Sequence, residues 1–206
     1  MNNTYKLDTT FNRAIILLTL TLISGQLITP DIHAQNARPE LPERKQTSLG
    51  LYVTSAEAFQ MWSADQKNVV ILDIRTPEEY LFVGHAPMAW NVPAFDQSFE
   101  WDPKQQHFPM VPNPDFIKTI KELFQPDDTL LITCRSGDRS AIAVNELAKI
   151  GYTRAYTITD GFEGGIVSDP ESVFSGQRMV NGWKNSGLPY TYDIDPKLMP
   201  LIDKEK

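Results

Sequence analysis

The sequence predicts an α/β fold with a central, mostly parallel sheet of about five strands and helices on both faces. Two observations lead to this prediction. Strand-like and helix-like segments alternate from residue 51 to residue 159, which is the order of parallel β–α–β units. The segments 69–74 and 129–134 are continuous apolar runs with β-branched residues, as expected for strands that are buried on both faces. A chain of 206 residues is long enough for one domain with a substantial core.

Each predicted element has a local reason. The expected strands are the short apolar runs at 51–54, 69–74, 89–93, 129–134 and 154–159. The expected helices have apolar residues on one side or begin and end with helix-terminal residues, and they are 55–62, 76–82, 114–124 and 140–151. Ser55 is a candidate N-cap, Pro77 suits a first turn and Gly151 suits a helix end. Residues 94–113 contain several prolines and are predicted to be mostly loop.

The N-terminal segment resembles a secretory signal peptide. Lys6 and Arg13 supply positive charge, the run 14–28 is largely apolar, and small residues end at Ala34, which is the order of regions in such signals. We therefore expect residues 1–34 to be removed on export to the periplasm. An uncleaved anchor is the alternative, but the apolar run is short for a span of roughly 20 residues, and no stable membrane insertion is expected after cleavage.

The remaining chain is predicted to be one domain between two polar segments. Residues 35–48 are polar and contain prolines without a periodic apolar pattern, so they are expected to be a flexible lead-in. The domain is expected to cover residues 49–190. The chain from about Gly182 onward is rich in Pro, Gly and Asp, and residues 191–206 are predicted to be a C-terminal tail on the surface.

The composition argues against several classes of protein. The formal net charge of −7 disfavours nucleic-acid binding and adhesion to anionic lipid, because both need clustered positive charge. A single cysteine cannot form an internal disulfide. The three histidines (His33, His85 and His107) are not spaced as zinc ligands. We therefore expect neither a metal nor another cofactor.

The only cysteine, Cys134, lies where a predicted buried strand ends and a predicted helix begins. Ligands bind beyond the carboxyl ends of the strands in open α/β sheets. The residues that follow are candidates for substrate binding, namely Arg135, Ser136, Gly137, Asp138, Arg139 and Ser140. A helix N-terminus and a glycine turn can direct backbone N–H groups at an anion, and the two arginines add permanent positive charge.

These surroundings favour the thiolate, which is the nucleophilic form of cysteine. The sequence therefore predicts a reactive thiol at Cys134, with hydroxyl donors at Ser136 and Ser140. Asp138 opposes the positive surroundings and is expected to point outward. The alternative is a buried structural cysteine, which is the more common role of a lone cysteine without such a context.

Three blocks of the sequence resemble the rhodanese (sulfurtransferase) family. LDIRTPEEY at 72–80 resembles the family's Asp-x-Arg-x-x-x-Glu-Tyr segment, and GHAPMAWNVP at 84–93 resembles its Gly-His-Ile-Pro-Gly-Ala segment. CRSGDRS at 134–140 resembles its active-site loop. Residues 49–190 are thus identified as a single rhodanese-like domain, in which Met88 stands where the family usually has glycine.

The resemblance implies that Cys134 accepts a sulfane sulfur from a small anionic donor such as thiosulfate and becomes a persulfide. Cyanide or a thiol, including one on a partner protein, would then remove the sulfur in a ping-pong reaction. Arg135 and Arg139 would orient the donor's sulfonate. Asp73 and Arg75 are expected to support the site by fixing turns through hydrogen bonds, and His85 is expected to stabilise its loop rather than to act as a base.

Two other functions stay open. Cysteine phosphatases and arsenate reductases also use a thiolate in an anion-binding loop, but their loops are one residue longer between cysteine and arginine than the four residues that separate Cys134 from Arg139. The shorter loop predicts a pocket sized for sulfur rather than phosphate. A non-catalytic binding module with the rhodanese fold is the second alternative, although such members often lose the cysteine that this chain retains.

Overall fold

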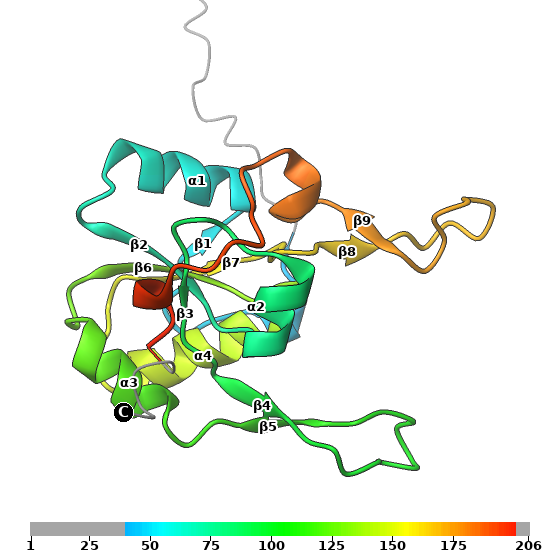
Figure 1. Ribbon diagram of the computed structural model, residues 1–206, viewed down its shortest axis with the longest axis horizontal. Coiled ribbons are helices and arrows are strands. Elements are labelled where there is room, and N and C mark those ends of the chain that lie inside the picture. Colours follow the sequence, from blue (N-terminus) through cyan, green and yellow to red (C-terminus); the bar gives the residue numbers. More distant parts are fainter. Residues whose placement is uncertain (1–39, 201–206) are drawn as a thin grey trace, which may run out of the picture. The chain divides into compact units, whose positions relative to one another are not determined.

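A parallel sheet of five strands forms the centre of the computed structural model, which describes residues 40–200 (Figure 1). The strands in spatial order are β1 (Tyr52–Val53), β7 (Ala155–Ile158), β6 (Thr129–Thr133), β2 (Val69–Asp73) and β3 (Trp90–Asn91). Every neighbouring pair is parallel. The predicted α/β class and parallel sheet are confirmed, and the predicted signal peptide at 1–34 lies outside the described residues.

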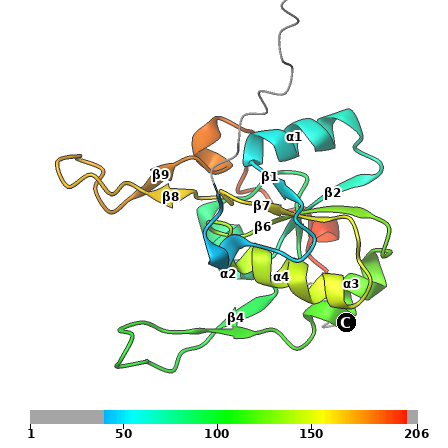
Figure 2. The same ribbon diagram turned by 180° about the vertical axis from the view of Figure 1, so that it is seen from behind.

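Helices cover both faces of this sheet, as Figures 1 and 2 show from opposite sides. The four α-helices of the described residues are α1 (Ser55–Ala64), α2 (Pro77–Val83), α3 (Phe116–Leu123) and α4 (Asp138–Lys149). One face packs against α3 and α4 and contains Ile120, Val144 and Leu147. The other face packs against α1 and contains Ala58. We call these two groups of apolar side chains the α3–α4 cluster and the α1 cluster.

The alternation of side chains along the central strands explains why these strands are apolar throughout. In β2 and the residue after it, Leu72 and Ile74 join the α3–α4 cluster, whereas Ile71 joins the α1 cluster. In β6, Leu130 and Leu131 divide in the same way. Successive side chains of a strand point to opposite faces, so a sheet that is covered on both faces buries all of them.

The helices α1 and α2 both begin with a capping box. At α2, the Thr76 side chain accepts from the Glu79 N–H while the Glu79 side chain accepts from the Thr76 N–H. At α1, the same reciprocal pair joins Thr54 and Glu57. The prediction that Ser55 is the N-cap was therefore wrong by one residue, because Thr54 is the residue with a glutamate three positions later.

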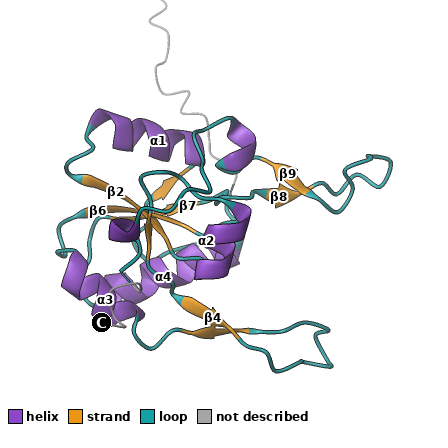
Figure 3. Ribbon diagram, viewed as in Figure 1, coloured by secondary structure: helices purple, strands orange, loops and turns teal. Residues whose placement is uncertain are grey.

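Two antiparallel hairpins project from the sheet and its helices (Figure 3). The first pairs β4 (Phe95–Gln97) with β5 (Met110–Pro112), and the second pairs β8 (Gly165–Ile166) with β9 (Arg178–Val180). Residues 94–113 were predicted to be mostly loop, and that prediction missed β4 and β5. Their strands are too short to show an alternating pattern, so the pairing could not be seen in the sequence.

The segments that flank the predicted domain contact it. Within the described part of the lead-in, a 3₁₀-helix (Glu43–Lys45) precedes Ser48, whose N–H donates to the Asn145 side chain of α4. After the 3₁₀-helix Lys184–Ser186, the chain pairs Thr191 with His85 through two backbone hydrogen bonds. A last 3₁₀-helix (Pro196–Leu198) is followed by Met199, which is buried in the α1 cluster.

Two further observations concern membrane spans and metal ligands. No helix between residues 40 and 200 is both long enough and apolar enough to cross a membrane. In the same part of the chain, His, Cys, Asp and Glu side chains do not gather in threes or more as metal ligands would.

Candidate active site

Cys134 lies directly after β6, at the carboxyl end of the central strand of the sheet. Its residue surface is 1% exposed, and Cys134 is one of the buried residues of the α3–α4 cluster. The sulfur is nevertheless in a polar contact, because the Gly137 N–H donates to Cys134 Sγ over 3.1 Å. The Ser140 hydroxyl oxygen lies 3.7 Å from the same sulfur and can accept from the thiol form. The thiol is thus enclosed by the loop that follows it.

Gly137 shapes this loop. It is the N-cap of α4 and has a φ of 101°, in the left-handed region that favours glycine. This conformation turns the Gly137 N–H toward the sulfur while its carbonyl oxygen accepts from the Ser140 hydroxyl over 2.9 Å. A glycine turn and a helix N-terminus beside the sulfur were both expected from the sequence, and both are present.

A second turn, residues 160–164, packs against the loop. The N–H groups of Phe162 and Glu163 donate to the carbonyl oxygens of Cys134 and Arg135 over 2.8 and 2.9 Å. A side chain at Gly161 would meet the Ser136 nitrogen and the Cys134 oxygen at 2.6 and 2.7 Å, distances at which atoms overlap. The glycine is therefore required for the two turns to touch, and the contact fixes the backbone of the loop.

Arg139 is held by Glu79 of α2. Its two terminal nitrogens donate to the two carboxylate oxygens over 2.7 and 2.6 Å, which is the bidentate geometry of a strong ion pair. Burial alone would lower the pKa of Arg139, but Glu79 raises it, with a smaller contribution from Cys134. The guanidinium that was predicted to orient a donor is therefore paired with Glu79, and this pair fixes α4 to α2.

The other loop side chains differ in exposure. Arg135 is exposed, Ser136 is half-buried, and Ser140 is fully buried behind the sulfur. Asp138 Oδ2 accepts from Arg44 Nε over 3.1 Å in an exposed pair. Only Oδ2 of Asp138 is thus directed to the lead-in, whereas its Oδ1 is buried without a hydrogen-bond partner among the described residues.

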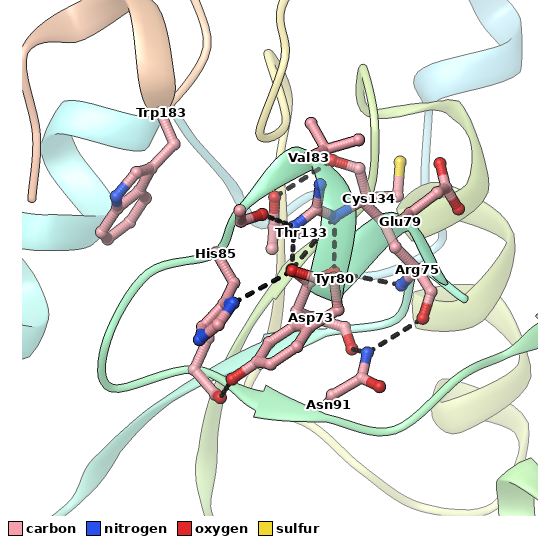
Figure 4. Close-up of polar contacts among 12 residues, drawn as sticks. Asp73, Arg75, Glu79, Tyr80, Val83, His85, Asn91, Thr133, Cys134 and Trp183 are labelled. Atoms are coloured by element: carbon pink, nitrogen blue, oxygen red, sulfur yellow. Dashed lines mark hydrogen bonds and ion pairs between the residues drawn. The ribbon is translucent and has the colours of Figure 1, made fainter. Parts of the chain in front are cut away.

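Asp73 and Arg75 form a completely buried ion pair below the loop (Figure 4). Arg75 Nε and Nη2 donate to the Asp73 carboxylate over 2.6–3.0 Å, and Nη2 also donates to the Gly84 carbonyl over 2.8 Å. The Arg75 guanidinium lies 4.1 Å from the centre of the Phe162 ring. Burial alone would lower the pKa of Arg75, but Asp73 raises it, so the arginine stays charged and links β2 to the turn at 160–164.

His85 contacts the backbone rather than the thiol. Its Nδ1 lies 3.0 Å from the Tyr80 carbonyl oxygen and its Nε2 lies 3.2 Å from that of Asp193, and its ring stacks on Tyr80 at 3.6 Å between centres (Figure 4). Burial lowers the pKa of His85 despite these contacts. The histidine therefore stabilises its own loop, the role expected from the sequence, and it also contacts the C-terminal segment, which was not expected.

The model of the rhodanese-like domain matches residues 55–166 of this chain. The chain belongs to the rhodanese-like family. A family of this kind was inferred from three sequence blocks, and the match includes all three.

Individual relatives agree with the assignment. An uncharacterised protein of Rickettsia prowazekii, RP600, is 30% identical over 68% of this chain and 96% of its own length. Thiosulfate sulfurtransferase 16 from the chloroplast of Arabidopsis thaliana is 35% identical over 57% of this chain and 76% of its own. The crystal structure of Rv0390 from M. tuberculosis is 25% identical, with a TM-score of 0.51 over 69% of this chain and 97% of its own. The family and its named members support a sulfurtransferase-like enzyme.

The rhodanese-like site includes residues that were not selected from the sequence. Glu79 was noted only as part of a sequence block, yet it is both the N3 residue of the α2 capping box and the partner of Arg139. Gly161 belongs to the DGFEGG turn at 160–165, which fits the family resemblance, but it was not singled out as a site residue. A glutamate that lies 60 positions from its arginine gives no local signal. The spacing of the family block was the one clue available for Glu79.

The Glu79–Arg139 pair gives the rhodanese-like domain a measurable pH dependence. The two side chains are 22% and 15% exposed, and Glu79→Gln is expected to lower the free energy of unfolding by about 2 kcal/mol at pH 7, the range for a hydrogen-bonded charge. Arg139 holds the folded-state pKa of Glu79 below its ordinary value of 4.5 although burial opposes this. The stabilisation is therefore complete above pH 4.5 and is lost as the pH falls through the folded-state value.

Urea denaturation of the wild type and Glu79→Gln at pH 7 and at about pH 3 would measure this loss. The matched control is Glu78→Gln, since Glu78 is the exposed neighbour in the same turn of α2, and it should change stability by less than about 0.5 kcal/mol. Equal effects of the two substitutions at pH 7 would contradict the assigned pairing.

Proposed function

We propose that this protein is a sulfurtransferase that moves a sulfane sulfur from thiosulfate, or from another anionic sulfur donor, to cyanide or a thiol through a persulfide on Cys134. The observation that carries the proposal is the 3.1 Å contact between the Gly137 N–H and Cys134 Sγ. It supplies a donor to a sulfur anion at the positive end of α4, where a nucleophilic cysteine needs such surroundings.

The first half-reaction needs no general base once the thiol is ionised. The Cys134 thiolate attacks the sulfane sulfur of thiosulfate, and a bond forms between Sγ and that sulfur. The sulfur–sulfur bond of thiosulfate breaks, and sulfite leaves with the electron pair. The Gly137 N–H, 3.1 Å from Sγ, is in position to donate to the attacking thiolate.

The second half-reaction converts the persulfide on Cys134 back to the thiolate. Cyanide attacks the terminal sulfur of the persulfide, a carbon–sulfur bond forms, and thiocyanate leaves. The persulfide bond breaks and its electron pair returns to Cys134 Sγ as a thiolate. A thiol acceptor reacts in the same way and becomes a persulfide itself, so both half-reactions conserve atoms and electrons.

Intact-mass spectrometry of the purified protein after exposure to thiosulfate tests the proposal. The wild type should gain one sulfur atom, about 32 Da, and lose it when cyanide is added, because the covalent intermediate is predicted to accumulate without an acceptor. Cys134→Ser is the control and should gain no mass. An unchanged wild-type mass, together with hydrolysis of a phosphate ester above the rate in buffer, would favour the phosphatase alternative instead.

A further inference from the structure

The described part of the lead-in, residues 40–48, precedes the region that the family model matches, yet it contacts the active-site loop and α4 (Figure 2). Arg44 Nε donates to Asp138 in the first turn of α4 over 3.1 Å, and the Ser48 N–H donates to the Asn145 side chain over 2.8 Å. Both side chains of the Arg44–Asp138 pair are exposed, and exposed ion pairs add little stability. These two contacts place the lead-in along α4.

The contact that reaches toward the interior is made by Lys45. Its side chain is half-buried, and its Nζ donates to the Thr159 carbonyl oxygen over 2.8 Å. Thr159 follows β7, and its own N–H donates to the Val53 carbonyl of β1 over 2.9 Å. Thr159 is therefore held through its N–H by the sheet and through its carbonyl by the lead-in. Hydrogen bonds with a charged donor are stronger than those between neutral groups.

The Thr159 carbonyl in turn limits the position of Gly137. It lies so close to the glycine that a Cβ there would overlap the Thr159 oxygen. Gly137 is buried and begins α4 without a side-chain cap, so this contact from outside restricts where its backbone can move. On the inner side, the Gly137 N–H donates to Cys134 Sγ over 3.1 Å. A continuous path of contacts thus leads from Lys45 through Thr159 and Gly137 to the sulfur.

We propose that Lys45 is a positioning residue of the active site, which holds the Thr159 carbonyl against Gly137 and thereby keeps the Gly137 N–H on the Cys134 sulfur. This inference rests on the proposed sulfur transfer, in which that N–H donates to the attacking thiolate. Lys45 acts through the two intervening residues rather than on the sulfur itself. The lead-in is then a working part of the domain, although it lies before residue 55, where the family match begins.

A purely structural Lys45 would fasten the lead-in to the domain and do nothing more. Its removal would then lower the stability of the whole domain, and amides that exchange with solvent through global unfolding would all exchange faster by the same factor. A positioning role predicts a local effect instead. The Gly137 N–H should exchange faster, whereas the N–H of Val144, a buried residue in the middle of α4, should keep its exchange rate.

Amide hydrogen exchange followed by NMR on the reduced protein tests the proposal. In Lys45→Met, the Gly137 N–H should exchange about tenfold faster than in the wild type, the factor that corresponds to loss of one charge-assisted hydrogen bond. Persulfide formation from thiosulfate, followed by intact mass, should slow by about the same factor. Lys45→Arg should restore both rates, because a guanidinium can also donate to a carbonyl.

The matched control is Arg44→Met, which removes the same charge from the preceding residue of the 3₁₀-helix. It should change each rate by less than about twofold, because the ion pair that it breaks is exposed. Thermal unfolding of each variant would show whether a change in rate is accompanied by a loss of fold.

The outcomes separate this inference from the proposed function. An unchanged exchange rate of the Gly137 N–H in Lys45→Met would overturn the inference, and so would an equal acceleration at Gly137 and Val144. Faster exchange at Gly137 with an unchanged rate of persulfide formation would also overturn it, because the contact would then not serve the reaction. The exchange measurement needs no sulfur donor. Faster exchange at Gly137 in Lys45→Met, combined with no gain of sulfur by wild-type Cys134, would refute sulfur transfer while supporting the link from Lys45 to Gly137.

Discussion

Asp73→Asn is expected to lower the free energy of unfolding by about 3–5 kcal/mol, the cost of leaving a buried charge without its partner. The Asp73 carboxylate accepts three hydrogen bonds from the Arg75 side chain and one from its N–H. An asparagine at position 73 replaces one carboxylate oxygen with an NH₂ group, and this donor would face the N–H donors of Arg75. The Arg75 guanidinium is completely buried and cannot turn to water, so it would keep its charge without an anion.

Thermal and urea unfolding would measure the effect, which corresponds to a fall in Tm of about 10 °C for a domain of this size. Asp127→Asn is the control, because Asp127 is exposed, and it should change stability by less than about 0.5 kcal/mol. The double variant Asp73→Asn with Arg75→Met removes both charges and should be more stable than Asp73→Asn alone. A double variant that is less stable than Asp73→Asn would refute the view that the unpaired charge is the main cost.

Gly137→Ala is expected to slow persulfide formation by about 100-fold, because a small displacement of a reacting group has an effect of that order. A Cβ at Gly137 would overlap the carbonyl oxygen of Thr159 and lie 2.8 Å from its carbon. The Thr159 backbone is held to β1 by its N–H, which donates to the Val53 carbonyl, so the loop would move instead. The Gly137 N–H would then leave the Cys134 sulfur.

Gly151→Ala is the control that separates two effects of an alanine at Gly137, which are the strain of a left-handed backbone conformation and the overlap of the new Cβ with other atoms. Gly151 has a φ of 97°, close to that of Gly137, but no atom lies within 4 Å of the position that a Cβ would take there. This variant should lose about 1–2 kcal/mol of stability through the left-handed conformation alone and keep its rate of sulfur uptake. The rate of sulfur uptake in each of the two variants would be measured by quenching the reaction with thiosulfate at successive times and recording the intact protein mass. A normal rate in Gly137→Ala would show that the glycine contact is not needed for the chemistry.

Local patterns were sufficient for most of the central fold. The apolar runs at β2 and β6 are long enough to indicate buried strands, and the α2 helix is marked by Thr76, Pro77 and Glu79 within four residues. The hairpins were missed because their strands have two or three residues. Such short strands form through pairing with a distant partner, which no local window contains.

The part of the candidate site that is contiguous in the sequence could be predicted. Cys134, Gly137 and Ser140 belong to one loop, and their contacts follow from a strand that ends beside a helix N-terminus. The partner of Arg139 was not predictable in this way, since several acidic residues could have reached it.

The burial of Trp183 and Met199 limits how early the domain can complete its core during synthesis. Trp183 packs edge-on against Phe59 of α1 at 5.8 Å between ring centres, yet Trp183 and Met199 both follow Ile166, where the family match ends. A nascent chain that has reached only Ile166 would leave this apolar face of α1 uncovered. Such a chain would be a substrate for chaperones, and for aggregation in their absence, until the final segment emerges from the ribosome.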